Sequence, residues 1–238
     1  MSDQNAVTEM FDGISSSYDH LNHLLSFGID RVWRRKTSKW VSQHHPSTIL
    51  DVATGTADLA IRLASDNPSA SVTGIDLSAK MLEIGKRKVE RKKLSHRVVL
   101  EMADATAMPF PDHSFDAVTV AFGVRNFADY DAGLHEMFRV CRQGGLIAIL
   151  EFSHPTHAVV KVPYRWYSQR WIPTLGKRVS KHPNAYSYLP ASVEAFPSEA
   201  FEAKLNEMGL TNVQKKAFSG GIATLFYGYT PKNHLSSQ

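Results

Sequence analysis

The stretch of residues 48–58, Thr-Ile-Leu-Asp-Val-Ala-Thr-Gly-Thr-Ala-Asp, restricts the possible folds of this chain more than any other. Apolar and β-branched residues lead into Asp51, small residues follow at Ala53, Gly55 and Ala57, and a helical pattern resumes over 58–64. This order predicts a buried strand, a tight turn and a helix. Small side chains let the backbone approach a ligand, and the free N–H groups at the start of the helix can bind an anionic group.

A second predicted strand, residues 71–75, ends at Asp76. A carboxylate at this place can accept two hydrogen bonds from a ribose diol. The turn after Asp51 does not contain the pattern Gly-x-Gly-x-x-Gly, so a nucleoside with a small charged tail fits better than a dinucleotide. The turn resembles the glycine-rich motif of class I methyltransferases, which bind S-adenosylmethionine. Taken alone, so short a motif is equally compatible with an ordinary strand, turn and helix.

Strands and helices continue to alternate along the chain. The next predicted elements are a helix over 77–88 with Ser78 as its N-cap, a strand over 98–102, a strand over 115–122, a helix over 132–140, a turn over 142–145 and a strand over 146–150. This alternation indicates a parallel sheet with helices on both faces. Toward the C-terminus, a helix over 199–208 precedes two short strands, 213–218 and 222–229, which we expect to add an antiparallel hairpin to the sheet edge.

Polar residues follow the predicted strands at the ends where ligands of such sheets collect. They are Asp51, Asp76, Asp104, Arg125 and Glu151. Asp104 repeats the pattern of an acid beyond a strand end, where its carboxylate can accept a hydrogen bond from an adenine amino group. Five polar residues along one rim favour a binding site over a set of solvated loops.

The composition fits a globular protein of 238 residues, 43% of them hydrophobic. The single cysteine, Cys141, excludes an internal disulfide and suits a reducing compartment. The histidines form no His-Glu-x-x-His pattern, and we expect no metal site. The chain has neither an apolar run long enough to span a bilayer nor an N-terminal signal peptide, so we expect a cytoplasmic protein.

The positive charge is concentrated in residues 155–190. This segment contains six Lys or Arg residues and no acidic residue, whereas the net charge of the whole chain is +4. Tryptophans and tyrosines, among them Trp166 and Trp171, are interleaved with the cations. Such a mixture is expected at a membrane interface or a nucleic-acid surface. A solvated loop and helix that pack their aromatic residues on the core are an equally good interpretation.

Several longer motifs resemble the C-methyltransferases of menaquinone and ubiquinone biosynthesis. They are residues 11–33, with Phe11, Tyr18, Asp19, Asn22, Gly28 and Trp33 at characteristic positions, residues 110–115, Ala-Phe-Gly-Val-Arg-Asn at 121–126, Glu-Phe-Ser at 151–153 and Ser-Gly-Gly-Ile at 219–222. The resemblance covers roughly residues 8–230. Three positions depart from the family pattern. Asp30 stands where histidine is common, Ala57 replaces a glycine, and Gln143 replaces a proline. We expect the methyl group of Ala57 to be tolerated if its φ stays negative.

The resemblance implies a class I methyltransferase, with a Rossmann-like seven-stranded α/β sheet, helices on both faces and an N-terminal helical cap. It implies methyl transfer from S-adenosylmethionine to a ring carbon of a polyprenylated quinol, with demethylmenaquinol as the expected acceptor. The cofactor-binding residues implied are Asp51, Gly55, Thr56, Asp76, Asp104 and Ala105. The catalytic residues implied are Arg125 and Asn126, with Tyr18 and His154 as helpers. An ion pair with an acid of the same rim, such as Asp104, is an alternative role for that arginine.

The chain is expected to form one methyltransferase domain. Its parts are the N-terminal cap (1–46), the cofactor-binding core (47–153), the basic aromatic insertion (154–196), and the C-terminal helix and hairpin (197–230). A polyprenyl substrate lives in the bilayer, so residues 155–190 offer a peripheral contact with the inner face of the membrane. No nucleic-acid partner is expected, and a homodimer stays open. The alternative functions are methylation of RNA or another small molecule, and a cofactor-binding assembly subunit without turnover.

Overall fold

Seven strands form one sheet in the order β3-β2-β1-β4-β5-β7-β6 in the computed structural model, which describes residues 12–13, 26, 28–153, 155, 166, 188 and 191–232. The strands are β1 (Thr48–Val52), β2 (Ser71–Asp76), β3 (Val98–Met102), β4 (Phe115–Ala121), β5 (Cys141–Phe152), β6 (Thr211–Phe218) and β7 (Ala223–Tyr229). The first five strands pair in parallel, and β7 pairs antiparallel with both β5 and β6. The strand order reverses between β1 and β4, and ligands of open α/β sheets bind at this switch point.

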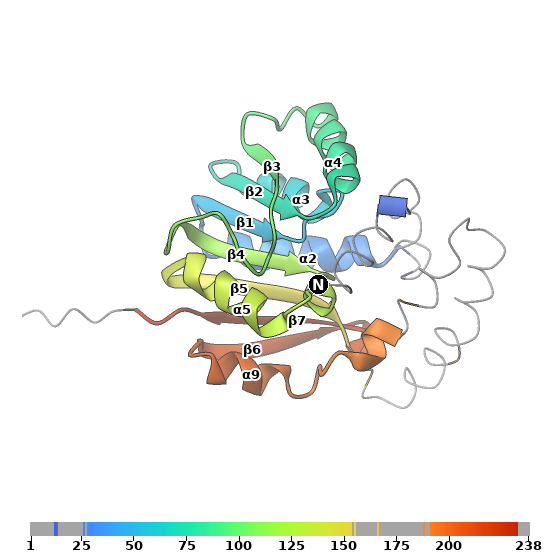
Figure 1. Ribbon diagram of the computed structural model, residues 1–238, viewed down its shortest axis with the longest axis vertical. Coiled ribbons are helices and arrows are strands. Elements are labelled where there is room, and N and C mark those ends of the chain that lie inside the picture. The colour runs from blue at the N-terminus through green and yellow to red at the C-terminus, as the bar shows by residue number, and fades with distance from the viewer. Residues whose placement is uncertain are drawn as a thin grey trace, which may run out of the picture.

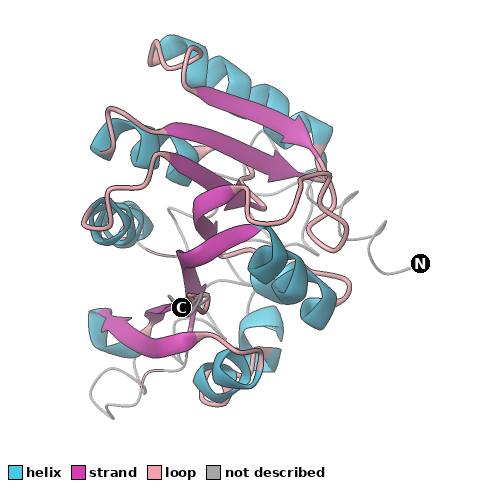
Figure 2. Ribbon diagram, turned by 90° about the vertical axis from the view of Figure 1, so that its left-hand side faces the viewer, coloured by secondary structure: helices cyan, strands magenta, loops and turns pink. Residues whose placement is uncertain are grey.

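Helices cover both faces of the sheet, as Figures 1 and 2 show. They are α2 (Asp30–Ser42), α3 (Asp58–Asp66) and α4 (Ala79–Arg91) on one face, α5 (Tyr130–Val140) and α9 (Phe201–Glu207) on the other, and the short 3-10 helices η1 (Val124–Asn126) and η3 (Ser219–Gly221). The predicted N-cap is confirmed, because Ser78 Oγ accepts a hydrogen bond from the Met81 N–H at 3.1 Å. No helix in the described part of the chain has both the length and the apolar content to cross a bilayer.

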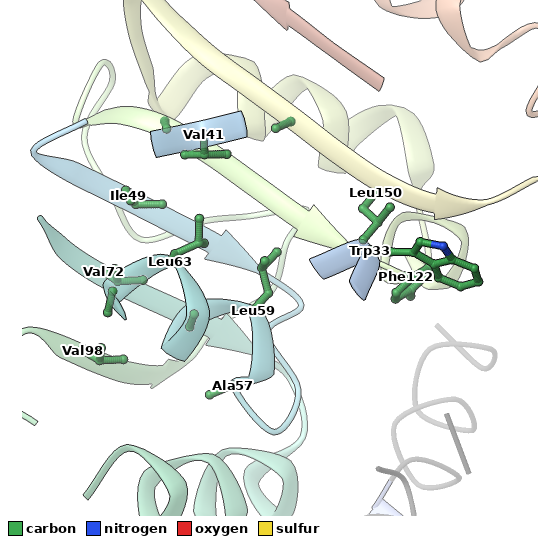
Figure 3. Close-up of a cluster of buried hydrophobic side chains, with 14 of the residues drawn as sticks. Trp33, Val41, Ile49, Ala57, Leu59, Leu63, Val72, Val98, Phe122 and Leu150 are labelled. Carbon is green, nitrogen blue, oxygen red and sulfur yellow. The ribbon is translucent and has the colours of Figure 1, made fainter. Parts of the chain in front are cut away.

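The core consists of two apolar layers, one on each side of the sheet. Alternate residues of β5 point to opposite faces, so Ala148 and Leu150 join the layer under α2 and α3, whereas Ile147 and Ile149 join the layer under α5 and α9. Figure 3 shows the first layer, in which Leu150 lies near Trp33 of α2. A strand that is buried on both faces needs a continuous apolar run, which explains the sequence of residues 146–150.

The predicted turn over 142–145 is wrong in detail. β5 already begins at Cys141, which pairs with Phe115, and the regular pairing resumes at Ala117 and Leu146 after a shift in register. Gly144 has φ +71° within this irregular stretch. The segment is therefore a bulge at the start of the strand, for which glycine supplies the left-handed backbone.

The predicted C-terminal hairpin is confirmed. β7 pairs with β5 inside the sheet and β6 forms the edge, with Phe218 opposite Ala223 at the turn. The antiparallel direction follows from the short connection, because a parallel strand would need a long crossover.

Candidate active site

Asp51 lies at the centre of a hydrogen-bonded group at the carboxyl end of β1. Its carboxylate is buried and accepts hydrogen bonds from Thr54 Oγ1 at 2.6 Å and from Thr119 Oγ1 at 2.9 Å. Burial raises the pKa of Asp51 to about 6, and the two hydroxyl donors limit the rise. Near neutral pH the group therefore places a buried negative charge at the switch point, where it can attract a cation.

This raised pKa predicts how stability depends on pH. The pKa of Asp51 is about 6 in the folded chain, against an ordinary value of 3.8 for an aspartate in water, so the folded state holds the proton more tightly. The free energy of unfolding should therefore fall as the pH rises through this window, by up to about 3 kcal/mol from this residue. The Asp51→Asn variant lacks the ionisation and should lose less stability between pH 4 and pH 7, measured by urea unfolding without cofactor.

Asp116 provides a control, because its pKa is shifted in the opposite direction. Burial alone would raise the pKa of Asp116, but hydrogen bonds from the backbone N–H groups of Thr48 and Ser47 outweigh it and lower the pKa. The ionised carboxylate is thus the form favoured in the fold, and Asp116→Asn should cost more stability at neutral pH than in acid. If the free energies of unfolding of wild type and Asp51→Asn differ by the same amount at every pH, the prediction for Asp51 is contradicted.

The turn between β1 and α3 contains three residues with left-handed backbone. The φ angles are +50° at Ala53, +56° at Gly55 and +66° at Ala57. The condition that φ of Ala57 stays negative is therefore not met, and the alanine costs about 1–2 kcal/mol relative to a glycine that adopts the same backbone freely. The conformation lets the Ala57 carbonyl accept the N–H of Ile61 at 2.9 Å, which begins α3.

Asp76 at the end of β2 is tied to the same turn. One carboxylate oxygen accepts a hydrogen bond from the Gly55 N–H at 2.8 Å, and the other accepts one from the Ser78 N–H at 2.9 Å. Burial raises the pKa of Asp76, while these N–H groups oppose the rise. A carboxylate oxygen can accept two hydrogen bonds, so each oxygen keeps capacity for a ribose hydroxyl.

Asp104 and Ala105 follow β3, one strand further along the sheet. Asp104 Oδ1 accepts hydrogen bonds from the backbone N–H and the hydroxyl of Thr106, at 2.8 and 2.9 Å. These bonds fix the loop in which Ala105 packs into the apolar layer under α5. The structure thus places both residues at the carboxyl end of the strand next to Asp76, on the rim predicted from the sequence.

Thr56 contacts a cation that sequence reasoning missed. Lys88 Nζ, from α4, donates to Thr56 Oγ1 at 2.8 Å and to Asp58 Oδ1 at 2.7 Å. The lysine ties α4 to the first turn of α3, where the acidic Asp58 also favours the positive end of the helix dipole. The sequence does not indicate this role, because Lys88 is one of several basic residues of α4. Only the position of α3 beside the helix distinguishes it from the others.

A cavity of about 340 Å³, part of it open to solvent, lies beside these residues. Its lining includes Asp51, Gly55, Thr56, Ala121 and, from α2, Arg34. Sequence reasoning also missed Arg34, although there was a signal. The residue falls on the buried stripe of an amphipathic helix, where a cation is rare without a partner. Here Asp30 accepts a hydrogen bond from Arg34 at 2.5 Å.

An aromatic cluster lies at the carboxyl ends of β4 and β5. Phe122, which follows β4 with φ +61°, packs against Phe152 with ring centroids 4.5 Å apart, and Trp33 contacts both rings. Arg34 lies over Phe122, at 5.0 Å from the ring centroid. Figure 3 shows Trp33 beside Phe122. A left-handed backbone at so bulky a residue is uncommon and is often found near functional sites.

Arg125 is held in place by a buried carboxylate. Its guanidinium forms an ion pair with Glu151 and donates to the Phe122 carbonyl at 2.8 Å, and the two charged side chains are 4% and 0% exposed. Arg125 thus forms an ion pair with a rim acid, as the alternative role predicted, but the partner is Glu151 and not Asp104. Burial raises the pKa of Glu151, and Arg125 opposes the rise. Within the described residues Glu151 Oε2 has no hydrogen-bond partner.

Asn126 lies beside this pair in η1. Its side-chain carbonyl accepts a hydrogen bond from the Tyr188 hydroxyl at 3.0 Å, and Arg125 Nε contacts Ser192 Oγ at 3.3 Å. The insertion therefore reaches the predicted catalytic pair through two hydroxyl groups, which no sequence motif had indicated. The predicted helpers Tyr18 and His154 lie outside the described residues, and so does most of segment 155–190.

The residues around the cavity fit S-adenosylmethionine. The ligand carries a cationic sulfonium and ammonium, a carboxylate, a ribose diol and an adenine. The cavity brings the buried carboxylate of Asp51 together with the guanidinium of Arg34, and Asp76 stands at the next strand end with spare acceptor capacity. Both charges of the methionyl end and the diol thus have a complementary group nearby.

The sheet order, with acids at successive strand ends, is that of the class I S-adenosylmethionine-dependent methyltransferase fold. Solved structures agree on the fold. An S-adenosylmethionine-dependent methyltransferase from Aquifex aeolicus is similar, with TM-score 0.55 and 18% identity over 77% of this chain and 81% of that one. The [4+2]-cyclase SpnF gives TM-score 0.63 and 18% identity, covering 98% of each chain. Since that protein is named for a cyclisation, the fold alone does not assign the reaction.

The chain belongs to the ubiE/COQ5 methyltransferase family, which it matches over residues 1–230. The demethylmenaquinone methyltransferase of Bacteroides fragilis is 44% identical over 221 residues, covering 92% of this chain and 90% of the relative. That of Thermus thermophilus is 46% identical over 223 residues, covering 93% and 100%. The ubiquinone/menaquinone biosynthesis C-methyltransferase UbiE of Geotalea daltonii is 45% identical over 224 residues, covering 93% and 95%. This protein is therefore an S-adenosylmethionine-dependent C-methyltransferase of quinone biosynthesis.

Proposed function

We propose that the acceptor is demethylmenaquinol and that Arg125 promotes its methylation at a ring carbon. The observation that carries this proposal is the fixed guanidinium at the carboxyl end of β4, held by the buried Glu151 in the turn that follows Ala121 of the cofactor cavity. A cation at this place suits an acceptor that develops negative charge on oxygen. Relatives from two bacterial lineages that carry the name demethylmenaquinone methyltransferase support the choice of acceptor.

The cofactor is assigned to the first three strand ends. Asp76 accepts from the ribose diol, Asp104 accepts from the adenine amino group with Ala105 beside the ring, and Asp51, Gly55 and Thr56 shape the turn around the methionyl end. Bound S-adenosylmethionine supplies an electrophilic methyl group. The hydrogen bonds of Asp51 and Asp76 to the turn hold these groups in place before the ligand arrives, which lowers the entropic cost of binding.

Arg125 acts on the acceptor. A quinol carbon is a weak nucleophile until an adjacent hydroxyl loses its proton, and the pKa of a phenol is about 10. Arg125 donates to this hydroxyl oxygen and stabilises the phenolate as it forms, which raises the electron density at the neighbouring ring carbon. After that carbon takes the methyl group, it loses its hydrogen as a proton and the ring regains aromaticity.

Asn126, Tyr18 and His154 are proposed to handle the proton of the hydroxyl. The proton passes to a base or to a water that a base activates. Asn126 is already oriented by Tyr188 and can hold such a water, while Tyr18 and His154 are the candidates for the base. Both reacting groups must be aligned within about 3–3.5 Å, so orientation contributes much of the acceleration.

The chain is proposed to act as one methyltransferase domain that meets its substrate at the membrane. A polyprenyl tail keeps the acceptor in the bilayer, so the enzyme is expected to work from the cytoplasmic side. The exposed Trp166 in the basic aromatic insertion supports a contact at the headgroup level. Self-association into a homodimer is compatible with this arrangement.

Deletion of the gene tests the acceptor directly. Mass spectrometry of the quinone pool should show that menaquinone disappears and that a species one methyl group lighter accumulates. Reintroduction of the wild-type gene should restore menaquinone, whereas Arg125→Ala should not. Accumulation of a ubiquinone precursor would reassign the acceptor within the family, and an unchanged quinone pool would contradict the proposal.

A further inference from the structure

The outer face of α2 combines cations with exposed aliphatic residues. The helix buries one stripe, which includes Trp33 and Arg34, and its only acidic residue, Asp30, is buried as well. The opposite side, which we call the α2 outer face, consists of Ile29, Arg31, Val32, Arg35, Lys36 and Lys39. Ile29 is 37% and Val32 46% exposed, and they are two of the few large apolar side chains exposed in the described part of the chain.

The two helical layers differ in charge. In the layer with this face, α2 contains five basic residues and one acidic residue, α4 contains five and two, and α3 contains one and two. In the opposite layer, α5 and α9 each contain one basic and two acidic residues. Figure 2 shows these layers on the two sides of the sheet. The protein therefore presents a positive side to an anionic partner and a weakly negative side away from it.

The first turn of α2 lies at the end of the sheet that holds the active site. Trp33 packs on Phe122, which follows β4, and on Phe152, which ends β5. Figure 1 shows the parallel strands ending on the side from which α2 enters. Ile29 and Val32 are within one turn of Trp33, so the aliphatic part of the outer face borders the rim where the acceptor binds.

An anionic bilayer suits this face better than a nucleic acid. Single-stranded nucleic acids are bound by basic grooves with exposed aromatic rings on which bases stack, but the α2 outer face has no aromatic residue. Exposed aliphatic side chains at one end of a basic helix match a surface that offers negative headgroups above an apolar interior. With 13 residues, α2 is too short to span a bilayer and can only lie along it.

We propose that the α2 outer face docks on the headgroups of an anionic bilayer, with Ile29 and Val32 at the boundary to the acyl chains. Docking in this way presents the rim of the active site to the membrane that holds a polyprenylated acceptor. The purpose of this docking rests on the proposed function, whereas the contact with the bilayer does not depend on it. Arg35 and Lys39 contribute directly, since neither forms an ion pair with any described residue.

Vesicle binding by the full-length protein tests this contact. Vesicles of phosphatidylcholine with phosphatidylglycerol should bind the wild type, whereas vesicles of phosphatidylcholine alone should not. Arg35→Glu with Lys39→Glu should weaken binding by about 100-fold, because each charge near an anionic surface changes the affinity severalfold. Ile29→Ser with Val32→Ser should weaken it by about tenfold through lost apolar burial. Binding is measured by co-sedimentation at fixed ionic strength.

A matched control has the same change in net charge at the far end of the layer. Arg91 and Lys92, at the end of α4, are exposed and lie before β3, away from the strand ends. Arg91→Glu with Lys92→Glu should weaken binding by less than about fivefold, through the general fall in charge. Equal losses in both charge variants, or no loss in the α2 variant, would overturn the proposal. If the wild type binds RNA and the α2 charge variant loses that binding while it still binds vesicles, the proposal is overturned as well.

The outcome is separable from that of the proposed function, because the vesicles contain no quinone. If vesicle binding fails while detergent-solubilised demethylmenaquinol is still methylated, the docking face is wrong and the acceptor stands. If the α2 variant loses vesicle binding and the wild type does not methylate that quinol, the docking face stands and the acceptor is wrong.

Discussion

Replacement of Arg125 by alanine should reduce turnover by at least about 100-fold, as does the loss of one preorganised donor to a developing oxyanion. The affinity for S-adenosylmethionine should survive, because the contacts of Arg125 are with Phe122, Glu151 and Ser192 and not with the residues assigned to the cofactor. Single-turnover kinetics with demethylmenaquinol in detergent measures the first quantity, and titration calorimetry measures the second.

The same substitution should also weaken the fold. It leaves Glu151 buried with no positive partner, and loss of one member of a buried ion pair costs about 3–5 kcal/mol. A second variant separates folding from catalysis. Arg125→Met with Glu151→Gln removes both charges, so it should regain much of the stability while turnover stays low. Turnover within tenfold of wild type in this variant would remove Arg125 from the mechanism.

The sheet could be predicted because short apolar runs between turn signals mark the strands. Residues 146–150 are a continuous apolar run, as a strand covered on both faces requires. Residues 98–102 are nearly as apolar but form the edge strand β3, in which Val99 and Met102 are exposed, so this run marked a strand without reporting its burial. The bulge at Gly144 could not be predicted. A glycine pair after a helix indicates a turn, and only the pairing of Cys141 with Phe115 shows that the strand starts earlier.

The sequence predicted the parts of the candidate site that follow from the positions of strand ends. It did not predict the parts that depend on contacts between neighbouring strands. Asp51 and Asp76 stand directly at strand ends, so topology alone brings them together. The pairing of Arg125 with Glu151 joins the ends of β4 and β5, and the sequence leaves Glu151 and Asp104 as equally good partners. The φ of Ala57 depends on how the turn meets α3, and residue type alone does not decide it.

Replacement of Asp76 by alanine should weaken binding of S-adenosylmethionine by at least about 100-fold. Two hydrogen bonds from the ribose diol to a charged acceptor are lost, and each contributes about 1.5–3 kcal/mol. The substitution also releases the Gly55 and Ser78 N–H groups, so the turn loses its anchor. Asp66→Ala is the control, since this aspartate is held by Arg62 and Ser38 at the far end of α3 and should leave the affinity unchanged.

A cofactor analogue without the ribose hydroxyls distinguishes the diol contact from the anchoring of the turn. Calorimetry of both ligands with wild type and Asp76→Ala gives a thermodynamic cycle whose interaction term reports the direct contact. If Asp76 accepts from the diol, the analogue binds wild type much more weakly than the natural ligand, but the two ligands bind Asp76→Ala with similar affinity. If the carboxylate only anchors Gly55, the substitution should weaken both ligands equally, and the assignment of the ribose to the end of β2 would fail.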